Sequence, residues 1–192
     1  MKGIRFVSLF ASIIALLSAC SSPKTPEREV SSFTFLDQQG DAFGLSQLED
    51  TVWIADFIFT NCETVCPPMT SEMAALQEEF KKNDLDVQFV SFTVDPEIDT
   101  PDTLQTYAAH YTDDLSNWHF LTGYSKQEIT TFARENFQTI IQKPEASDQV
   151  IHGTNFYLIA KGGKLVSEFN YVDEDYVHDL LKTVQQYIKQ KN

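Results

Sequence analysis

The sequence predicts an α/β fold in which helices flank a central mixed β-sheet, with a β-hairpin near the C-terminus. Apolar runs typical of buried strands alternate with amphipathic helical patterns along most of the chain. Two late strand patterns are separated by Gly162-Gly163, which is typical of a hairpin turn, and an amphipathic helix follows them. A length of 192 residues allows one such domain and an N-terminal extension.

The individual elements follow from periodicity and from start and stop signals. Strands are expected at residues 32–36, 51–59, 87–94, 118–122, 154–159 and 164–170, with a short strand or helical turn at 43–48. Helices are expected at residues 67–82, 101–110, 125–136 and 173–189. Thr100-Pro101 and the Ser125–Glu128 capping box mark two of the helix starts. Residues 137–142 are expected to extend as a hairpin arm before a polar loop at 143–149.

Two cysteines follow the central strand, which breaks at Thr60-Asn61. Proline suits the first turn of a helix, so Pro67-Pro68 places Cys66 at the helix start and Cys62 on the loop before it. A helix N-terminus stabilises a thiolate, which is both the nucleophile and the soft-metal ligand. The pair is therefore predicted to be a redox pair, a soft-metal site, or both. A structural disulfide or a pair of buried apolar cysteines is disfavoured. No other cysteine of the mature chain could build a framework, and core cysteines rarely cluster on a strand-to-helix loop.

The N-terminus carries targeting features. Lys2 and Arg5 precede a short apolar run, and Leu17-Ser18-Ala19-Cys20 resembles a bacterial lipobox. This resemblance implies a signal peptide at residues 1–19, cleavage before Cys20 and diacylglycerol on its sulfur; an ordinary signal peptide is the alternative. Residues 20–32 then form a lipidated polar tether and residues 33–192 the folded domain. The expected location is the extracellular face of the cytoplasmic membrane.

The composition is strongly acidic. The formal net charge is -14, and loss of the two basic residues of the signal peptide leaves about -16 on the mature chain. Such a charge argues against nucleic acid and against adhesion to anionic lipid. It is compatible with attraction of a cation or a basic partner, although a solvated acidic surface explains it equally well. A monomer is expected, because no long apolar stretch is left unassigned.

Three motifs carry a family resemblance. The strand that ends at Cys62, with Asp56 six positions earlier, is similar to the redox strand of thioredoxins, but three residues rather than two separate Cys62 from Cys66. The segments at 57–70, 94–101 and 152–158, in this order, resemble the Sco (SenC) family of copper chaperones of cytochrome c oxidase assembly. They closely resemble the membrane-tethered Sco lipoproteins of Gram-positive bacilli. The resemblance covers about residues 33–190.

The resemblance implies a thioredoxin-like fold and one copper ion, Cu(I) or Cu(II), held by Cys62, Cys66 and His152. The implied role is maturation of the CuA centre of oxidase subunit II, by copper delivery, by reduction of that subunit's cysteines, or by both. A thiol reductant is implied as a further partner. The chemistry agrees, since two thiolates hold Cu(I) and an added imidazole makes Cu(II) tolerable. Structural zinc usually takes four protein ligands.

Two carboxylates are expected near this site. Asp56 is predicted to lie beneath the cysteine loop, where a raised pKa would let it assist thiol proton exchange; a carboxylate paired within the core is the equal alternative. Asp95 is expected to shape the wall of the site. The remaining histidines and the helix methionines are assigned to the surface or the core: His110, His119, His178, Met69 and Met73.

Two functions remain open at this stage. The first is a metallochaperone that uses all three ligands. The second is a thiol–disulfide oxidoreductase with Cys62 and Cys66 as its catalytic redox pair, so the sequence does not decide whether the protein is an enzyme. A thiol peroxidase is disfavoured, because Phe59 stands where such an enzyme needs Thr or Ser, and no arginine lies near Cys62.

Overall fold

The computed structural model describes residues 28–145 and 147–189. The predicted signal peptide, the predicted lipidation site Cys20 and most of the predicted tether lie outside these ranges. Within the described ranges no helix is both long and apolar enough to cross a membrane.

A six-stranded mixed sheet forms the centre of the fold, with strand order β1-β8-β7-β4-β5-β6. Its strands are β1 (Arg28–Glu29), β4 (Val52–Ile58), β5 (Val87–Thr93), β6 (Trp118–Leu121), β7 (Asn155–Ala160) and β8 (Lys164–Asn170). A separate two-stranded sheet consists of β2 (Thr34–Leu36) and β3 (Ala42–Gly44). The helices are α1 (Leu45–Leu48), α2 (Cys66–Lys82), α3 (Pro101–Ala108), α4 (Lys126–Phe137) and α5 (Tyr176–Lys189). The predicted α/β architecture with a mixed sheet is confirmed.

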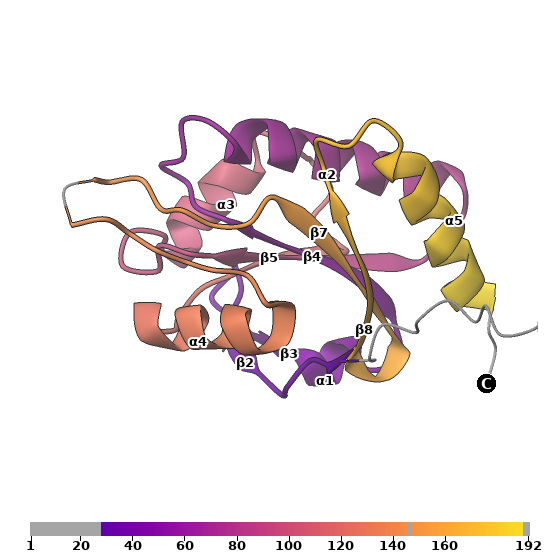
Figure 1. The fold of residues 1–192 in the computed structure, drawn as a ribbon, viewed down its shortest axis with the longest axis horizontal. Helices are drawn as coiled ribbons and strands as arrows, with labels where there is room; N and C mark the ends of the chain where they lie inside the picture. The colour runs from indigo at the N-terminus through magenta and orange to yellow at the C-terminus, as the bar shows by residue number, and fades with distance from the viewer. Residues whose placement is uncertain (1–27, 146, 190–192) are drawn as a thin grey trace, which may run out of the picture.

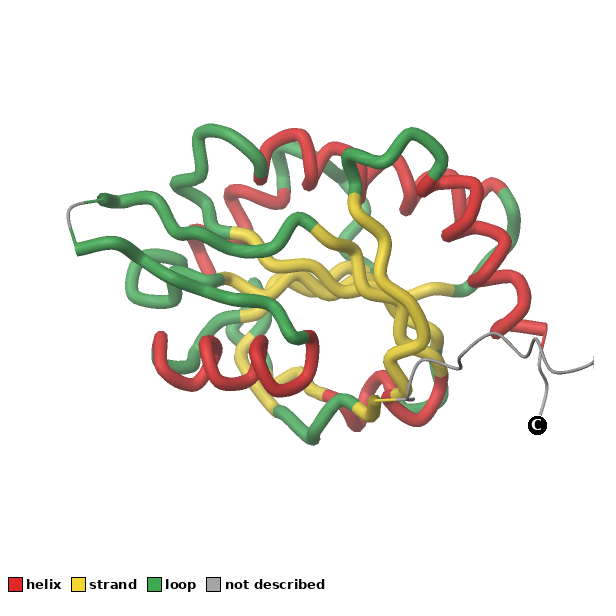
Figure 2. Tube along the Cα trace, in the orientation of Figure 1, coloured by secondary structure: helices red, strands yellow, loops and turns green. Residues whose placement is uncertain are grey.

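The helices cover both faces of the sheet. Figure 1 shows α2 and α5 on one side of the sheet and α4, α1 and the β2–β3 pair on the other. The yellow strands in Figure 2 lie between these layers. A sandwich of this kind buries the middle strand on both faces, and every residue of β4 is buried. The cysteine-bearing loop that follows β4 therefore starts from a fully buried strand.

Most predicted elements lie where the local signals put them. Thr100 caps α3, Ser125 and Glu128 form the capping box of α4, and β7 and β8 form the hairpin across the turn at Lys161–Gly163. The stretch at 43–48 contains both alternatives, the end of β3 and the short helix α1. The last helix begins at Tyr176, three residues later than predicted from Asp173.

The sheet starts before the predicted domain boundary at residue 33. Arg28 and Glu29 pair with β8, and the Val30 N–H donates to the Gly163 carbonyl at 2.8 Å. Val30 is buried in the core. Residues 28–32 thus belong to the folded domain rather than to a polar tether, because the edge of β8 offers backbone partners that the sequence pattern of this segment does not reveal.

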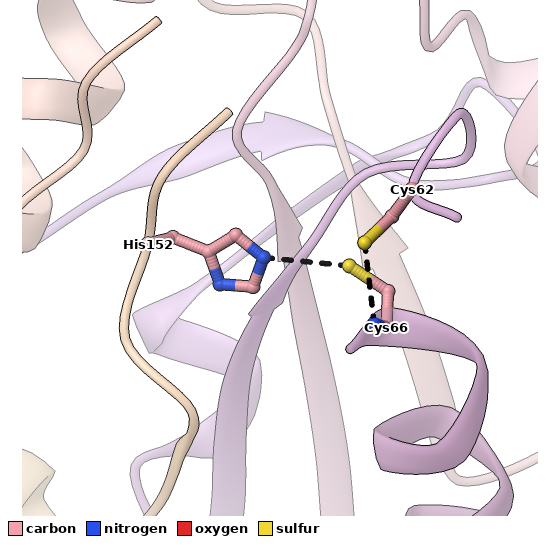
Figure 3. A group of neighbouring side chains, drawn as sticks. All are labelled: Cys62, Cys66 and His152. Carbon is pink, nitrogen blue, oxygen red and sulfur yellow. Dashed lines mark hydrogen bonds between the residues drawn. The ribbon is translucent and has the colours of Figure 1, made fainter. Parts of the chain in front are cut away.

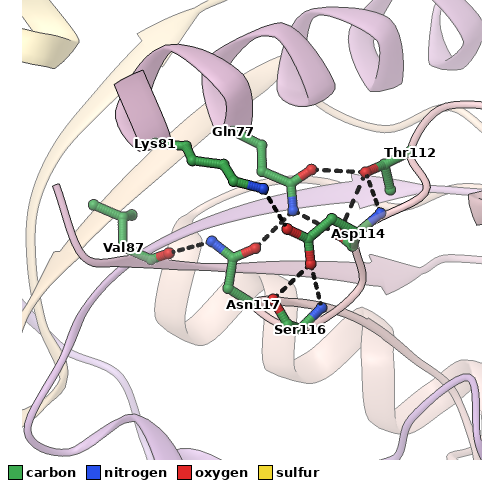
Figure 4. A network of polar contacts seen from close by, with 7 residues as sticks. All are labelled: Gln77, Lys81, Val87, Thr112, Asp114, Ser116 and Asn117. Atoms are coloured by element: carbon green, nitrogen blue, oxygen red, sulfur yellow. Dashed lines mark hydrogen bonds and ion pairs between the residues drawn. The ribbon is translucent and has the colours of Figure 1, made fainter. Parts of the chain in front are cut away.

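A polar network fixes the far end of α2 to the loop before β6 (Figure 4). The buried Gln77 amide donates to the Asp114 carbonyl at 2.8 Å and to Asn117 Oδ1 at 2.6 Å, and it accepts from Thr112 Oγ1 at 2.9 Å. Lys81 adds an exposed ion pair to Asp114 at 2.8 Å. These contacts hold α2 against the loop at the end opposite to Cys66.

Candidate metal centre

Strand pairing brings His152 to the cysteines. β7 runs antiparallel to β4, with Ala55 opposite Tyr157. Five residues after Ala55 along the chain comes Thr60, and five residues before Tyr157 comes His152. The antiparallel register therefore places Thr60 opposite His152, just beyond the carboxyl end of β4. The register of the sheet therefore brings together Cys66 and His152, which are 86 positions apart in the sequence.

The cysteine loop, residues 59–65, leads from β4 into α2. The Cys62 N–H donates to the Phe59 carbonyl at 3.3 Å, and α2 begins at Cys66 with prolines in its first turn, as predicted. The Cys66 N–H donates to Cys62 Sγ at 3.3 Å. Both cysteines are free thiols and both are buried, Cys62 with 7% of its surface exposed and Cys66 with none.

The three predicted ligands form one cluster (Figure 3). The ligand atoms of Cys62, Cys66 and His152 all lie within 4.8 Å of one another. His152 Nε2 lies 3.3 Å from Cys66 Sγ, and His152 Nδ1 lies 2.8 Å from the Gly153 carbonyl. Because a carbonyl only accepts, Nδ1 donates to it, and in the neutral imidazole the lone pair of Nε2 then faces the sulfurs. This is the tautomer that a metal-binding imidazole requires.

The two thiols differ in acidity. The pKa of Cys62 is lowered to about 3, chiefly by the hydrogen bond from the Cys66 thiol and also by the N–H groups of Cys66 and Thr64, while burial opposes the lowering. The same hydrogen bond and burial raise the pKa of Cys66 well above that of an ordinary thiol. The pair thus shares one proton at neutral pH, with the negative charge on Cys62.

Asp56 lies in the centre of β4 and is completely buried. Neither of its carboxylate oxygens has a hydrogen-bond partner among the described residues. The pKa of Asp56 is raised to about 7, chiefly by burial. The neighbouring Ser91 hydroxyl and the His152 imidazole lower the pKa, but by less than burial raises it. The absence of a partner among the described residues gives no support to the alternative of a carboxylate paired within the core, and the part of Asp56 in thiol proton exchange stays a prediction.

Asp95 lies in the loop after β5, and its side chain is 2% exposed. Its Oδ2 pairs with Lys143 Nζ at 2.6 Å, which joins this loop to the segment before His152. Sequence reasoning missed Lys143, and it also missed the buried Asp99, which accepts from the Thr60 N–H at 3.2 Å. Neither residue has a local signal, because each contact joins segments that are far apart in the chain.

The remaining histidines are not members of this cluster. Met69 and Met73 are buried in the core, and the ring of His119 stacks on Phe43 with centroids 3.7 Å apart. His110 Nδ1 bonds the Thr106 carbonyl within its own helical segment, and His178 is exposed on α5. Among the described residues, the donor set of two sulfurs and one imidazole nitrogen is the one group suited to a metal ion. Its softness fits copper, and its three ligands are fewer than structural zinc takes.

The fold and the site together define a thioredoxin-like protein with a thiol pair and a facing histidine. The family model described as SCO1/SenC matches residues 21–189, so the chain belongs to the SCO1/SenC family. It is 45% identical over 189 residues to the SCO1 protein homolog of Bacillus subtilis (strain 168), covering 96% of this chain and 97% of that protein.

Solved structures of relatives agree with this membership. A SCO1/SenC family lipoprotein from Bacillus anthracis is 45% identical with a TM-score of 0.84, over 87% of this chain and 99% of that one. BsSco, described as a member of the Sco family of cytochrome c oxidase assembly proteins with a disulfide switch, is 46% identical with a TM-score of 0.79, over 86% and 96%. Arabidopsis thaliana ScoI with copper bound is 27% identical with a TM-score of 0.71, over 84% and 98%.

Proposed function

We propose that this chain is a membrane-anchored copper metallochaperone that serves the assembly of the CuA centre of cytochrome c oxidase. It would bind one copper ion through Cys62, Cys66 and His152 and pass that ion to oxidase subunit II. The observation that carries the proposal is the cluster itself, whose two sulfurs and one nitrogen lie within 4.8 Å of one another. Copper bound to an Arabidopsis relative and the oxidase-assembly role of BsSco's family support it.

The anchor is part of the proposal. The lipobox-like sequence that ends at Cys20 follows a charged start and an apolar run. The related protein of Bacillus anthracis is a lipoprotein. Diacylglycerol on Cys20 would hold the domain at the extracellular face of the cytoplasmic membrane, beside a membrane-bound client.

The geometry explains how such a site would hold and release copper. The Gly153 carbonyl fixes the imidazole with Nε2 toward the sulfurs. Cys62 is already a thiolate at neutral pH, so only the Cys66 proton must leave when both sulfurs bind copper. A set of three protein ligands leaves room for a ligand from the client, which favours exchange of the cargo over permanent storage.

Anaerobic titration of the reduced full-length chain with Cu(II) in detergent tests this proposal. We expect a sulfur-to-copper charge-transfer band that saturates at one equivalent. The band should be lost in Cys62→Ser and in His152→Ala and retained in His178→Ala, a control in which the replaced histidine is exposed on α5. No band in the parent, with the thiols merely oxidised to a disulfide, would contradict Cu(II) binding by this set.

Thiol–disulfide exchange is the second candidate function, favoured by the low pKa of Cys62. The Cys62 thiolate would attack a client disulfide and release one client thiolate. The Cys66 sulfur, after losing its proton, would then attack the mixed disulfide and release the second. The client disulfide is thereby reduced to two thiols and the Cys62–Cys66 pair is oxidised to a disulfide. His152→Ala should retain most of this exchange while losing tight copper binding, which separates the two functions.

A further inference from the structure

Three loops meet at the proposed copper site, and each is tied to the other two. They are the cysteine loop (residues 59–65), the Asp95 loop (residues 94–100) and the arm (residues 138–145 and 147–152), which is drawn as loop in Figure 2. The Thr60 N–H donates to Asp99, and Gln149 Nε2 donates to the Asn61 carbonyl at 3.0 Å. The ion pair between Asp95 Oδ2 and Lys143 Nζ, at 2.6 Å, joins the Asp95 loop to the arm.

The Asp95–Lys143 ion pair, a contact made by the arm, is largely buried. The Asp95 side chain is 2% exposed and that of Lys143 is 19% exposed. The second oxygen of Asp95, Oδ1, has no hydrogen-bond partner among the described residues. The negative charge of this buried carboxylate is therefore balanced by the Lys143 ammonium. Removing one partner of a buried ion pair leaves an uncompensated charge, which is strongly unfavourable.

The ion pair is linked to His152 by a short path through the arm. Lys143 follows Gln142, and Gln142 and Ile151 form an antiparallel bridge with N–H to carbonyl distances of 2.9 and 2.8 Å. Ile151 immediately precedes His152. A shift of Lys143 relative to the Asp95 loop would therefore move the backbone that carries the imidazole.

We propose that Lys143 is a positioning residue for His152. Its ion pair with Asp95 holds the arm against the Asp95 loop, so that Nε2 of His152 stays within ligand distance of the Cys66 sulfur. Lys143 touches neither the metal nor a ligand atom in this scheme. The inference rests on the proposed copper site and adds a residue outside the ligand set to it.

The test is Cu(II) binding by the reduced full-length chain in which Lys143 is replaced by Met. Replacing a group that orients a metal ligand typically weakens metal binding by 10- to 100-fold, and we expect about 10-fold here. The coupling of Cu(II) to the imidazole nitrogen in the electron paramagnetic resonance spectrum should also become weaker, so that the spectrum comes to resemble that of His152→Ala. Lys143→Arg should restore both, because an arginine can pair with Asp95. Lys161→Met removes an exposed charge at the other end of β7 and should match the parent.

A second variant protects the test against a folding defect in Lys143→Met. Asp95→Asn should weaken copper binding similarly. The double variant should lose no more copper affinity than the weaker-binding single variant, because both substitutions break the same ion pair. If the losses of copper affinity in the two single variants instead add up in the double variant, the two residues act independently, and the ion pair is not what positions His152. Unchanged affinity and unchanged nitrogen coupling in Lys143→Met would overturn the proposal.

A metal-free measurement separates this proposal from the proposed function. The ring resonances of isotope-labelled His152 in the reduced apo chain report its tautomer and mobility. In Lys143→Met we expect them to broaden or to shift away from the Nδ1-protonated form seen in the parent. If the parent fails to bind copper while these resonances change, the copper function fails and the positioning role stands. If the resonances stay as in the parent, the positioning role fails.

Discussion

Asp56 should make the stability of this protein depend on pH. Its side chain is completely buried, and its oxygens have no hydrogen-bond partner among the described residues. Burial raises its pKa from 3.8 to about 7. We predict that Asp56→Asn, which keeps the shape of the side chain but cannot ionise, removes a loss of stability that the parent suffers as the pH rises.

The sign and the size follow from proton linkage. In the unfolded chain the carboxyl ionises near its ordinary pKa, whereas in the native state it keeps its proton up to about pH 7. Between these values the native state binds more protons, so the free energy of unfolding falls as the pH rises and reaches its lower level above pH 7. One pKa unit corresponds to roughly 1.4 kcal/mol, which gives about 4 kcal/mol over the whole window and about 3 kcal/mol between pH 5 and pH 8.

Urea unfolding of the reduced protein at pH 5 and pH 8 measures this effect. The free energy of unfolding of Asp56→Asn, relative to the parent, should rise by about 3 kcal/mol from pH 5 to pH 8. A constant penalty for burying the amide affects both pH values equally and leaves this difference intact. Asp50→Asn, at an exposed carboxylate, should follow the parent. Parallel profiles for Asp56→Asn and the parent would refute the reasoning.

Three further outcomes are expected. Iodoacetamide should modify Cys62 before Cys66, at a rate that is already maximal at pH 6 because the pKa of Cys62 is about 3; mass spectrometry of the modified peptide checks the order. Gly153→Ala should weaken copper binding and lower the melting temperature, because the new Cβ would lie 2.5 Å from Thr139 Oγ1, and calorimetry measures both. Gln77→Leu should destabilise the fold by about 2 kcal/mol in urea unfolding, since it removes the hydrogen bonds of a buried amide and leaves part-buried partners unpaired. Loss of the exposed Lys81 ion pair in Lys81→Ala should have a far smaller effect.

The sequence predicted those features that depend on neighbours in the chain. Cys66 begins α2 because two prolines follow it, and Ser125 caps α4 through Glu128 three residues later. Both signals lie within one turn of the feature they specify. His152 carries no such signal, and it entered the ligand set through resemblance to a family. The register of β7 on β4 supplies the physical reason for its position.

Contacts between distant segments were not predictable from local patterns. Lys143 looked like one residue of a polar loop, yet it is largely buried against Asp95, 48 positions away. Arg28 and Glu29 looked like part of a tether, yet they pair with β8. Each depends on which strands are neighbours and in what register, and a single sequence specifies this only through the whole fold.

The two thiols face different surroundings, and this bears on how one pair of sulfurs could serve two kinds of chemistry. Cys62 lines an open groove of about 620 Å³ between the cysteine loop and α3, together with Pro67 and Tyr107. Cys66 is completely buried and faces His152. An incoming thiol or disulfide would therefore meet the more acidic sulfur first, while the imidazole is held on the side of the less acidic one.

The copper-bound state and the disulfide state of this site exclude each other. Copper bound by the full set needs both sulfurs as thiolates, whereas a Cys62–Cys66 disulfide removes two of its three ligands at once. The imidazole alone would then be left to bind the ion. A chain that has reduced a client disulfide must therefore itself be reduced before it can bind copper again. If the chain performs both proposed functions, copper binding and thiol exchange at this site would therefore alternate in time, and the supply of reductant would decide which of the two states is populated.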